Sequence, residues 1–132
     1  MRILGIDYGL KKIGLALAEM ESKLAMPWGV IKVKSKNHQV AEKIKTLCEK
    51  EEVKQIVIGL PESGLVKKIK KFGRDLSLLT GLPVFYQDEN LTSKEAIAKM
   101  IEIGKGKKFR KEKEDAFAAA LILQDWLNLK NV

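Results

Sequence analysis

Hydrophobic and polar residues recur along the chain with two different periods, and the first quarter of the chain has the period of strands. Residues 3–7 are apolar on both faces, which is typical of a central strand covered on both sides of its sheet. Residues 13–18 are predicted to form a second strand that pairs back on the first as a hairpin. The turn-forming residues 27–29 lead into a third strand, expected over residues 30–33.

The remainder of the chain alternates helical patterns with short apolar runs. From residue 37 to about residue 52, apolar side chains recur at helical spacing, opposite a face of Lys and Glu. Further helices are predicted over residues 65–79, from a capping box at Thr92 and Glu95 to about residue 103, and over residues 112–129. Strands are predicted at residues 55–60 and 83–86, and a glycine-lysine loop at residues 104–111.

This order of elements predicts an α/β fold. Three meandering strands followed by crossover units give a mixed five-stranded sheet with helices on both faces. The chain has 132 residues, of which 45% are apolar. This is the size of one hydrophobic core, so we expect a single domain over residues 1–132.

Composition also narrows the location of the protein. No apolar run reaches the roughly 18–20 residues that a membrane span needs. Asp7 lies where a signal peptide would keep its apolar stretch, so we expect no export. The single cysteine, Cys48, cannot form an internal disulfide, which fits a reducing cytoplasm.

The charge balance favours a polyanionic partner. The chain has 25 Lys and Arg against 17 Asp and Glu, a net charge of +8, and nucleic acid is the commonest partner of such a surface. A solvated surface rich in Lys and Glu is the alternative. The single histidine, His38, lies in a polar stretch, so Ser-His-Asp catalysis and histidine-rich zinc sites are hard to build.

Carboxylates close two of the predicted strands. Asp7 ends the first strand, where ligands gather in α/β sheets, although an Asp before glycine is also a common turn residue. Asp88 and Glu89 end the fifth strand. Adjacent strand residues point to opposite faces, so only one of them can readily share a site with Asp7, and the other supports it or caps the next helix.

Asp115 is the most informative acidic residue. It shares one helical stripe with Ala119, Ile122 and Trp126, which is the apolar side that should face the sheet. An unpaired carboxylate there is costly, so a metal or a basic partner must compensate. A salt bridge or a contact with the helix dipole is the structural alternative.

Three carboxylates from distant segments, without histidine, favour Mg²⁺ or Mn²⁺ over zinc. Two such ions can activate a water and stabilise the leaving oxygen of a phosphodiester. Basic residues beside these acids are candidates for holding a nucleic-acid backbone. They are Lys11 and Lys12 in the first turn and Lys105, Lys107, Lys108, Arg110 and Lys111 before the last helix. A solvated lysine run is the alternative for the second group.

A set of motifs in this order resembles the YqgF (RuvX) family. The motifs are Gly5-Ile6-Asp7-Tyr8-Gly9, Lys12-Ile13-Gly14-Leu15-Ala16, Val57-Ile58-Gly59-Leu60-Pro61, Asp88-Glu89-Asn90-Leu91-Thr92-Ser93 and the run from Asp115-Ala116-Phe117 to Gln124. Each motif is weak alone, but together they span nearly the whole chain.

The resemblance implies an RNase H-like fold and a metal-dependent endonuclease that resolves Holliday junctions or matures precursor small-subunit ribosomal RNA. It implies catalytic roles for Asp7, Glu89 and Asp115, metal binding by these three and Asp88, structured RNA or branched DNA as partner, and a homodimer for junction cleavage. The chain differs from the family pattern in two places that concern substrate binding. The loop after Pro61 is short, and Asn90 stands where the family usually has Arg. A non-catalytic nucleic-acid-binding module in ribosome assembly or transcription is the alternative.

Overall fold

Five strands form one mixed sheet in the computed structural model, which describes residues 1–34, 37–89 and 107–130, with side chains for residues 1–34, 39–89 and 114–130. The strands are β1 (Arg2–Asp7), β2 (Lys12–Glu19), β3 (Ala25–Lys32), β4 (Val53–Leu60) and β5 (Val84–Asp88). Their order in the sheet is β3-β2-β1-β4-β5. The first three strands pair antiparallel, whereas β1–β4 and β4–β5 are parallel.

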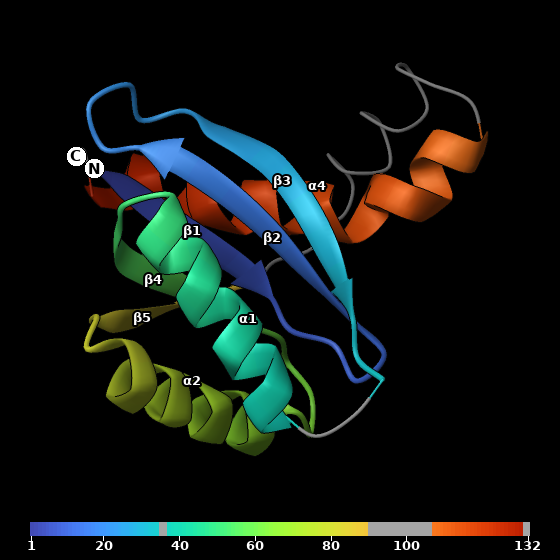
Figure 1. The fold of residues 1–132 in the computed structure, drawn as a ribbon. Helices are drawn as coiled ribbons and strands as arrows, with labels where there is room; N and C mark the ends of the chain where they lie inside the picture. Colours follow the sequence, from blue (N-terminus) through green and yellow to red (C-terminus); the bar gives the residue numbers. More distant parts are fainter. Residues whose placement is uncertain (35–36, 90–106, 131–132) are drawn as a thin grey trace.

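Helices cover both faces of this sheet, as the sequence predicts. The helices α1 (Asn37–Lys50) and α2 (Val66–Thr80) lie on one face, and α4 (Lys107–Lys130) crosses the other (Figure 1). Gly81 ends α2 in the left-handed conformation, with φ of 73°, which glycine adopts without steric cost. Among the described residues, no helix is long and apolar enough to span a membrane.

The third strand begins earlier than predicted. It starts at Ala25, whereas the sequence pattern placed its start at residue 30 because of Pro27. β3 is an edge strand and its pairing shifts register opposite Leu15 and Ala16. Proline is tolerated at an edge or a bulge because the missing N–H is not needed there.

The last helix also begins earlier. The prediction of a glycine-lysine loop was wrong for residues 107–111, which form the first turns of α4. The loop was inferred from Gly104 and Gly106, but the Lys and Arg residues that follow have straight side chains that favour helices. The capping box at Thr92 and its predicted helix lie outside the described residues.

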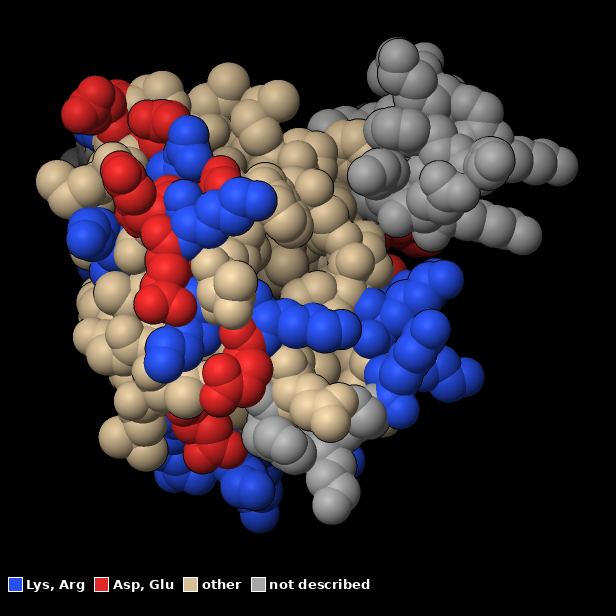
Figure 2. All heavy atoms as spheres, in the orientation of Figure 1, with Lys and Arg blue, Asp and Glu red and all other residues tan. Residues whose placement is uncertain are grey.

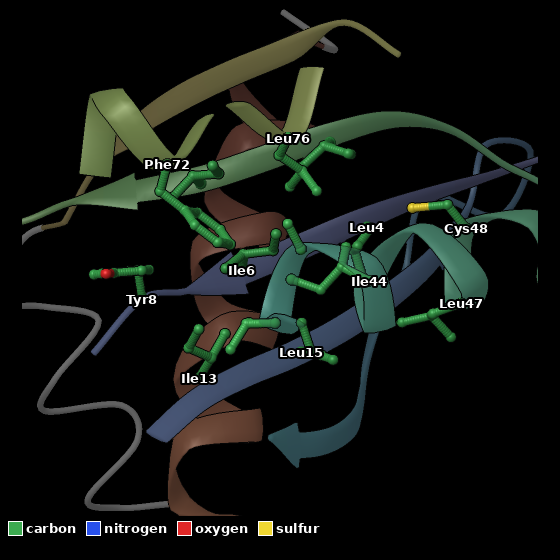
Figure 3. Close-up of a cluster of buried hydrophobic side chains, with 14 of the residues drawn as sticks. Leu4, Ile6, Tyr8, Ile13, Leu15, Ile44, Leu47, Cys48, Phe72 and Leu76 are labelled. Carbon is green, nitrogen blue, oxygen red and sulfur yellow. The ribbon is translucent and has the colours of Figure 1, made fainter. Parts of the chain in front are cut away.

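The first core layer fills the space between the sheet and the helices α1 and α2. Ile6, Ile44 and Phe72 are almost fully buried in it. Tyr8, just beyond the end of β1, packs its ring 4.9 Å from that of Phe72 (Figure 3). Ile6 and Tyr8 thus point to this face, which directs the intervening Asp7 to the face of α4.

The second core layer lies between the sheet and α4 and depends on small residues. A Cβ at Gly5 would be 2.8 Å from Cβ of Leu123 and 3.0 Å from the carbonyl oxygen of Ala119. A Cβ at Gly14 would overlap the backbone carbonyl of Asp115. Glycine in strand interiors often marks such close backbone approach. At Gly5 the backbone of β1 therefore contacts a side chain and a carbonyl of α4, and at Gly14 the backbone of β2 contacts the backbone of α4.

Gly14→Ala tests this contact. The new methyl group meets backbone atoms that cannot rotate away, so we expect a loss of about 3 kcal/mol or more in the free energy of unfolding, at the upper end for overpacking. Gly29→Ala is the matched control on β3, because nothing lies within 4 Å of its Cβ position. Urea unfolding of both variants checks this, and equal stabilities would contradict the packing described.

Candidate active site

Asp7 is the last residue of β1, next to the turn that leads into β2. Its Cα partner across the hairpin is Gly14. The side chain is partly buried and shares the strand face of Ile3 and Gly5, which pack against α4. The carboxylate of Asp7 therefore lies on the α4 face, at the end of a central strand.

Asp115 approaches the same place from the helix. Its backbone carbonyl lies against Gly14, the cross-strand partner of Asp7. Ala119, Ile122 and Trp126 of the same stripe are buried against the sheet, as predicted, and Asp115 itself is partly buried. Asp7 and Asp115 thus both lie beside Gly14, which has no side chain.

The helix-dipole alternative does not account for Asp115. Because α4 begins at Lys107, Asp115 lies two turns inside the helix, beyond the first turn where the helix dipole acts. Among the side chains that the structure describes, Asp115 forms no ion pair with a basic residue. The carboxylate is held at the sheet by the packing of its helix and not by a basic partner among these residues.

Glu89 joins this face from the end of β5. Its N–H donates to the carbonyl of Leu60 at 2.9 Å, which continues the pairing with β4. A Cβ at Gly59 would be 3.2 Å from Cγ of Glu89 and 2.5 Å from Cδ1 of Ile122, so the Glu89 side chain lies on the α4 face.

Asp88 has the opposite orientation. Along β5, Phe85 packs in the α4 layer, and Tyr86 packs in the layer of α1 and α2. By the same alternation, Glu89 points to the same face as Phe85. Asp88 points to the same face as Tyr86 and is exposed. The sequence left open which of the two shares a face with Asp7, and the fold brings Glu89 there.

The donor set suits a hard divalent cation, since it consists of carboxylates alone. Among the described residues, however, no group of three or more Asp, Glu, His or Cys side chains is placed to hold one metal ion together. Mg²⁺ is usually bound by one or two carboxylates and completed by waters and substrate phosphates. The three residues therefore fit an ion completed by substrate and not a closed protein cage.

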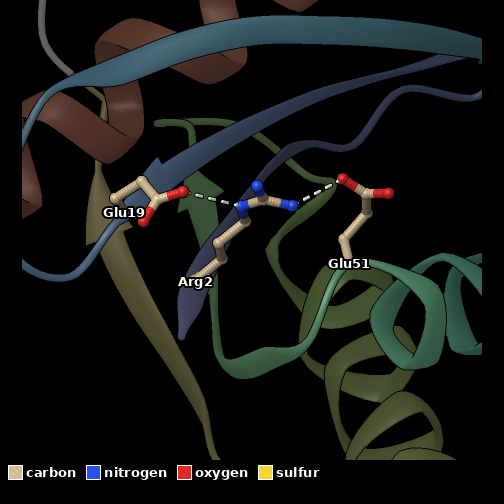
Figure 4. A network of polar contacts seen from close by, with 3 residues as sticks. All are labelled: Arg2, Glu19 and Glu51. Carbon is tan, nitrogen blue, oxygen red and sulfur yellow. Dashed lines mark hydrogen bonds and ion pairs between the residues drawn. The ribbon is translucent and has the colours of Figure 1, made fainter.

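Other acidic residues have structural roles at the opposite end of β1. Arg2 donates to Glu51 at 2.7 Å and to Glu19 at 3.1 Å (Figure 4). These contacts tie the start of β1 to the end of β2 and to the residues after α1. Glu19 and Glu51 thus lie at the opposite end of β1 from Asp7.

Cys48 is not a candidate nucleophile. The thiol is buried, and burial, with the nearby Glu49, raises its pKa to about 12. The thiolate is the reactive form of cysteine, so this thiol stays inert at neutral pH. His38 is the second residue of α1, and its side chain lies outside the described ones.

The predicted basic residues come from two segments of the chain. Lys11 and Lys12 are exposed at the turn beside Asp7. Lys107, Lys108, Arg110 and Lys111 belong to α4 by their backbone, and Lys105 lies outside the described residues.

Three residues that position the site were not identified from the sequence. Gly14 and Gly59 admit Asp115 and Glu89 to the sheet surface, and a glycine inside a strand was the signal for each. Gln124 fixes α4 to the β2–β3 hairpin. It accepts from the N–H of Ala25 at 2.9 Å and donates to the carbonyl of Lys23 at 3.2 Å, and no local pattern indicates this.

Comparison with solved structures supports the fold. RuvC of Thermus thermophilus in complex with a Holliday junction substrate superposes with a TM-score of 0.62 and 16% identity, covering 99% of this chain and 96% of that one. The fowlpox virus Holliday junction resolvase gives 0.63 and 17%, with full coverage of both chains. A ROK family transcriptional regulator gives 0.53 and 20%, over 76% of this chain and 30% of that one. The architecture therefore occurs in resolvases and in a regulator, so fold alone does not fix function.

Sequence comparison is more specific. A protein of Rickettsia canadensis named "Putative pre-16S rRNA nuclease" is 36% identical, covering 96% of this chain and 86% of its own length. A protein of Rickettsia bellii with the same name is 37% identical, over 98% and 87%. The sequence model of the RuvX family, described as Holliday junction resolvase, matches residues 1–129. Since this match and the identities span nearly the whole chain, the protein belongs to the RuvX family.

Proposed function

We propose that this protein is a metal-dependent endonuclease that hydrolyses phosphodiester bonds, with Asp7, Glu89 and Asp115 as its catalytic carboxylates in a single nuclease domain. One observation carries the proposal: three acids from distant segments lie on one sheet face, near the end of a central strand. Carboxylates that share a face in this way can take part in binding a divalent cation together with substrate phosphates.

A divalent cation, Mg²⁺ or Mn²⁺, would bind Asp7 together with Glu89 and Asp115, and two ions suit the reaction class. When bound, it would supply a nucleophilic water at neutral pH and stabilise charge on the phosphate. The protein residues orient the ions, while Lys11, Lys12, Lys105, Lys107, Lys108, Arg110 and Lys111 hold the backbone of the substrate. Asp88 points to the other face of the sheet, so we assign the ion to its neighbour Glu89.

Precursor 16S ribosomal RNA and Holliday junctions are the two substrates that the relatives suggest. Both present structured phosphodiester backbones, which suits a chain with a net charge of +8. Cutting a junction symmetrically would require a two-fold homodimer. Cleavage assays on a precursor RNA and on a four-way DNA junction separate the two.

Asp7→Asn and Asp115→Asn separate catalysis from stability. Each keeps the side-chain shape and removes one charge, so we expect the melting temperature without metal to be unchanged or slightly higher. Cleavage with Mn²⁺ should fall about a hundredfold or more, since a metal contributes several kcal/mol to the transition state. Asp75→Asn, at an exposed position of α2, is the charge-matched control. A non-catalytic binding module would instead show no carboxylate-dependent binding of Mn²⁺, and a lower melting temperature for Asp115→Asn would indicate a structural carboxylate.

Glu89→Gln and Asp88→Asn test which acid of this pair acts. Glu89 faces α4 and Asp88 is exposed, so the first change should reduce Mn²⁺-dependent cleavage about a hundredfold and the second by less than tenfold. Cleavage rates of both variants at saturating Mn²⁺ decide this. The reverse order of effects would show that Asp88 is the ligand.

A further inference from the structure

Two lysines lie directly opposite each other at the open end of the β2–β3 hairpin. Lys12 and Lys32 are Cα partners in the antiparallel register. Like charges in this position destabilise a strand pair. Both side chains are exposed, and neither forms an ion pair within the described residues. The sheet thus carries an unfavourable pair that a polyanion would neutralise.

The register also determines the face on which these lysines lie. Next to them, Ile13 and Ile31 are partners that pack in the layer of α1 and α2. By alternation, Lys12 and Lys32 point to the other face, that of Gly14 and α4. This is the face of Asp7 and Asp115, and Lys12 is only two residues, about 7 Å, along the strand from Gly14.

Lys34 extends the pair. The N–H of Val33 donates to the carbonyl of Lys11 at 2.8 Å, so the two chains remain paired just beyond the strand ends. Lys34 follows and is exposed. Figure 2 shows basic side chains gathered where the β2–β3 hairpin ends. Between residues 24 and 34 the chain has no acidic residue, whereas the lysines around α1 are interspersed with glutamates.

We propose that Lys12, Lys32 and Lys34 form a docking surface for a phosphodiester backbone, which leads a nucleic-acid strand across the β2–β3 hairpin to the carboxylates. This inference rests on the proposed nuclease function and specifies the path of its substrate. Lys32 and Lys34 were not candidates from the sequence, because they are twenty residues or more from Lys12 and only the hairpin register brings them beside it. The surface recognises backbone phosphates and so accepts RNA or DNA.

The experiment compares two triple variants that each remove three positive charges. The test variant is Lys12→Gln, Lys32→Gln and Lys34→Gln. The matched control is Lys43→Gln, Lys50→Gln and Lys54→Gln, at exposed lysines among the glutamates near α1. Binding of a labelled RNA stem-loop and of a labelled four-way DNA junction is followed by fluorescence anisotropy across a KCl series, without divalent cations. Melting curves verify that both variants are folded.

The test variant should bind about 10- to 100-fold more weakly near physiological salt, and its slope of log Kd against log salt should be smaller by about two to three. The control should bind like wild type. The test variant should melt no lower than wild type, since a repulsive pair has been removed. The stem-loop and junction arms show whether RNA, DNA or both use the surface.

The outcomes separate this proposal from the nuclease function. If the test variant keeps the wild-type slope, or the control loses affinity equally, the docking surface is wrong, and Mn²⁺-dependent cleavage by wild type still supports the nuclease function. If wild type binds neither probe, both proposals fall. If binding is lost only in the test variant but wild type cleaves neither probe with Mn²⁺, the docking surface stands and the nuclease function does not.

Discussion

The contact between α4 and the glycines of the sheet sets the geometry on which the candidate site depends. At Gly14 the helix backbone lies against the strand backbone, and neither can yield by changing a rotamer. The separation of Asp115 from the end of β1 is therefore fixed by main-chain packing. Gly5 and Gly59 extend the same close approach to β1 and β4. A site that must hold carboxylates near one another gains precision from such a rigid support.

Alternation at the strand ends sorts the acidic residues between the two faces. Tyr8 is anchored on Phe72 on the side of α1 and α2, which leaves Asp7 on the side of α4. Tyr86 has an equivalent role on β5, because its hydroxyl lies against Gly73 and donates to the carbonyl of Lys70 at 3.4 Å. In each case an aromatic residue in one core layer orients a carboxylate near it toward the other.

Charged side chains differ between the two ends of β1. At the start of β1, Arg2 forms ion pairs with Glu19 and Glu51, which fix the end of the strand. At the other end, Asp7 and the hairpin lysines Lys12 and Lys32 lie on the face of the sheet that α4 covers. Acidic and basic side chains that share one face can attract a cation and a polyanion to the same place.

Local patterns in the sequence were sufficient for the strands β1, β2 and β4, the helices α1 and α2, the two-sided sheet and the core-facing stripe of Asp115. These features depend on the period of apolar residues and on short-range turn chemistry. The same patterns misjudged β3 and the start of α4, since Pro27 and Gly106 were read as breaks. Proline is tolerated at a sheet edge, and only the strand order shows that β3 is at the edge.

Tertiary structure alone decided which carboxylates share a face. Glu89 rather than Asp88 faces α4 because the pairing of β4 with β5 fixes the register, and a shift by one residue would exchange the two. The pairing of Lys12 with Lys32 likewise depends on the hairpin register. The sequence determined which residue types were available for chemistry. Their convergence depends on contacts between segments far apart in the chain, which no local period encodes.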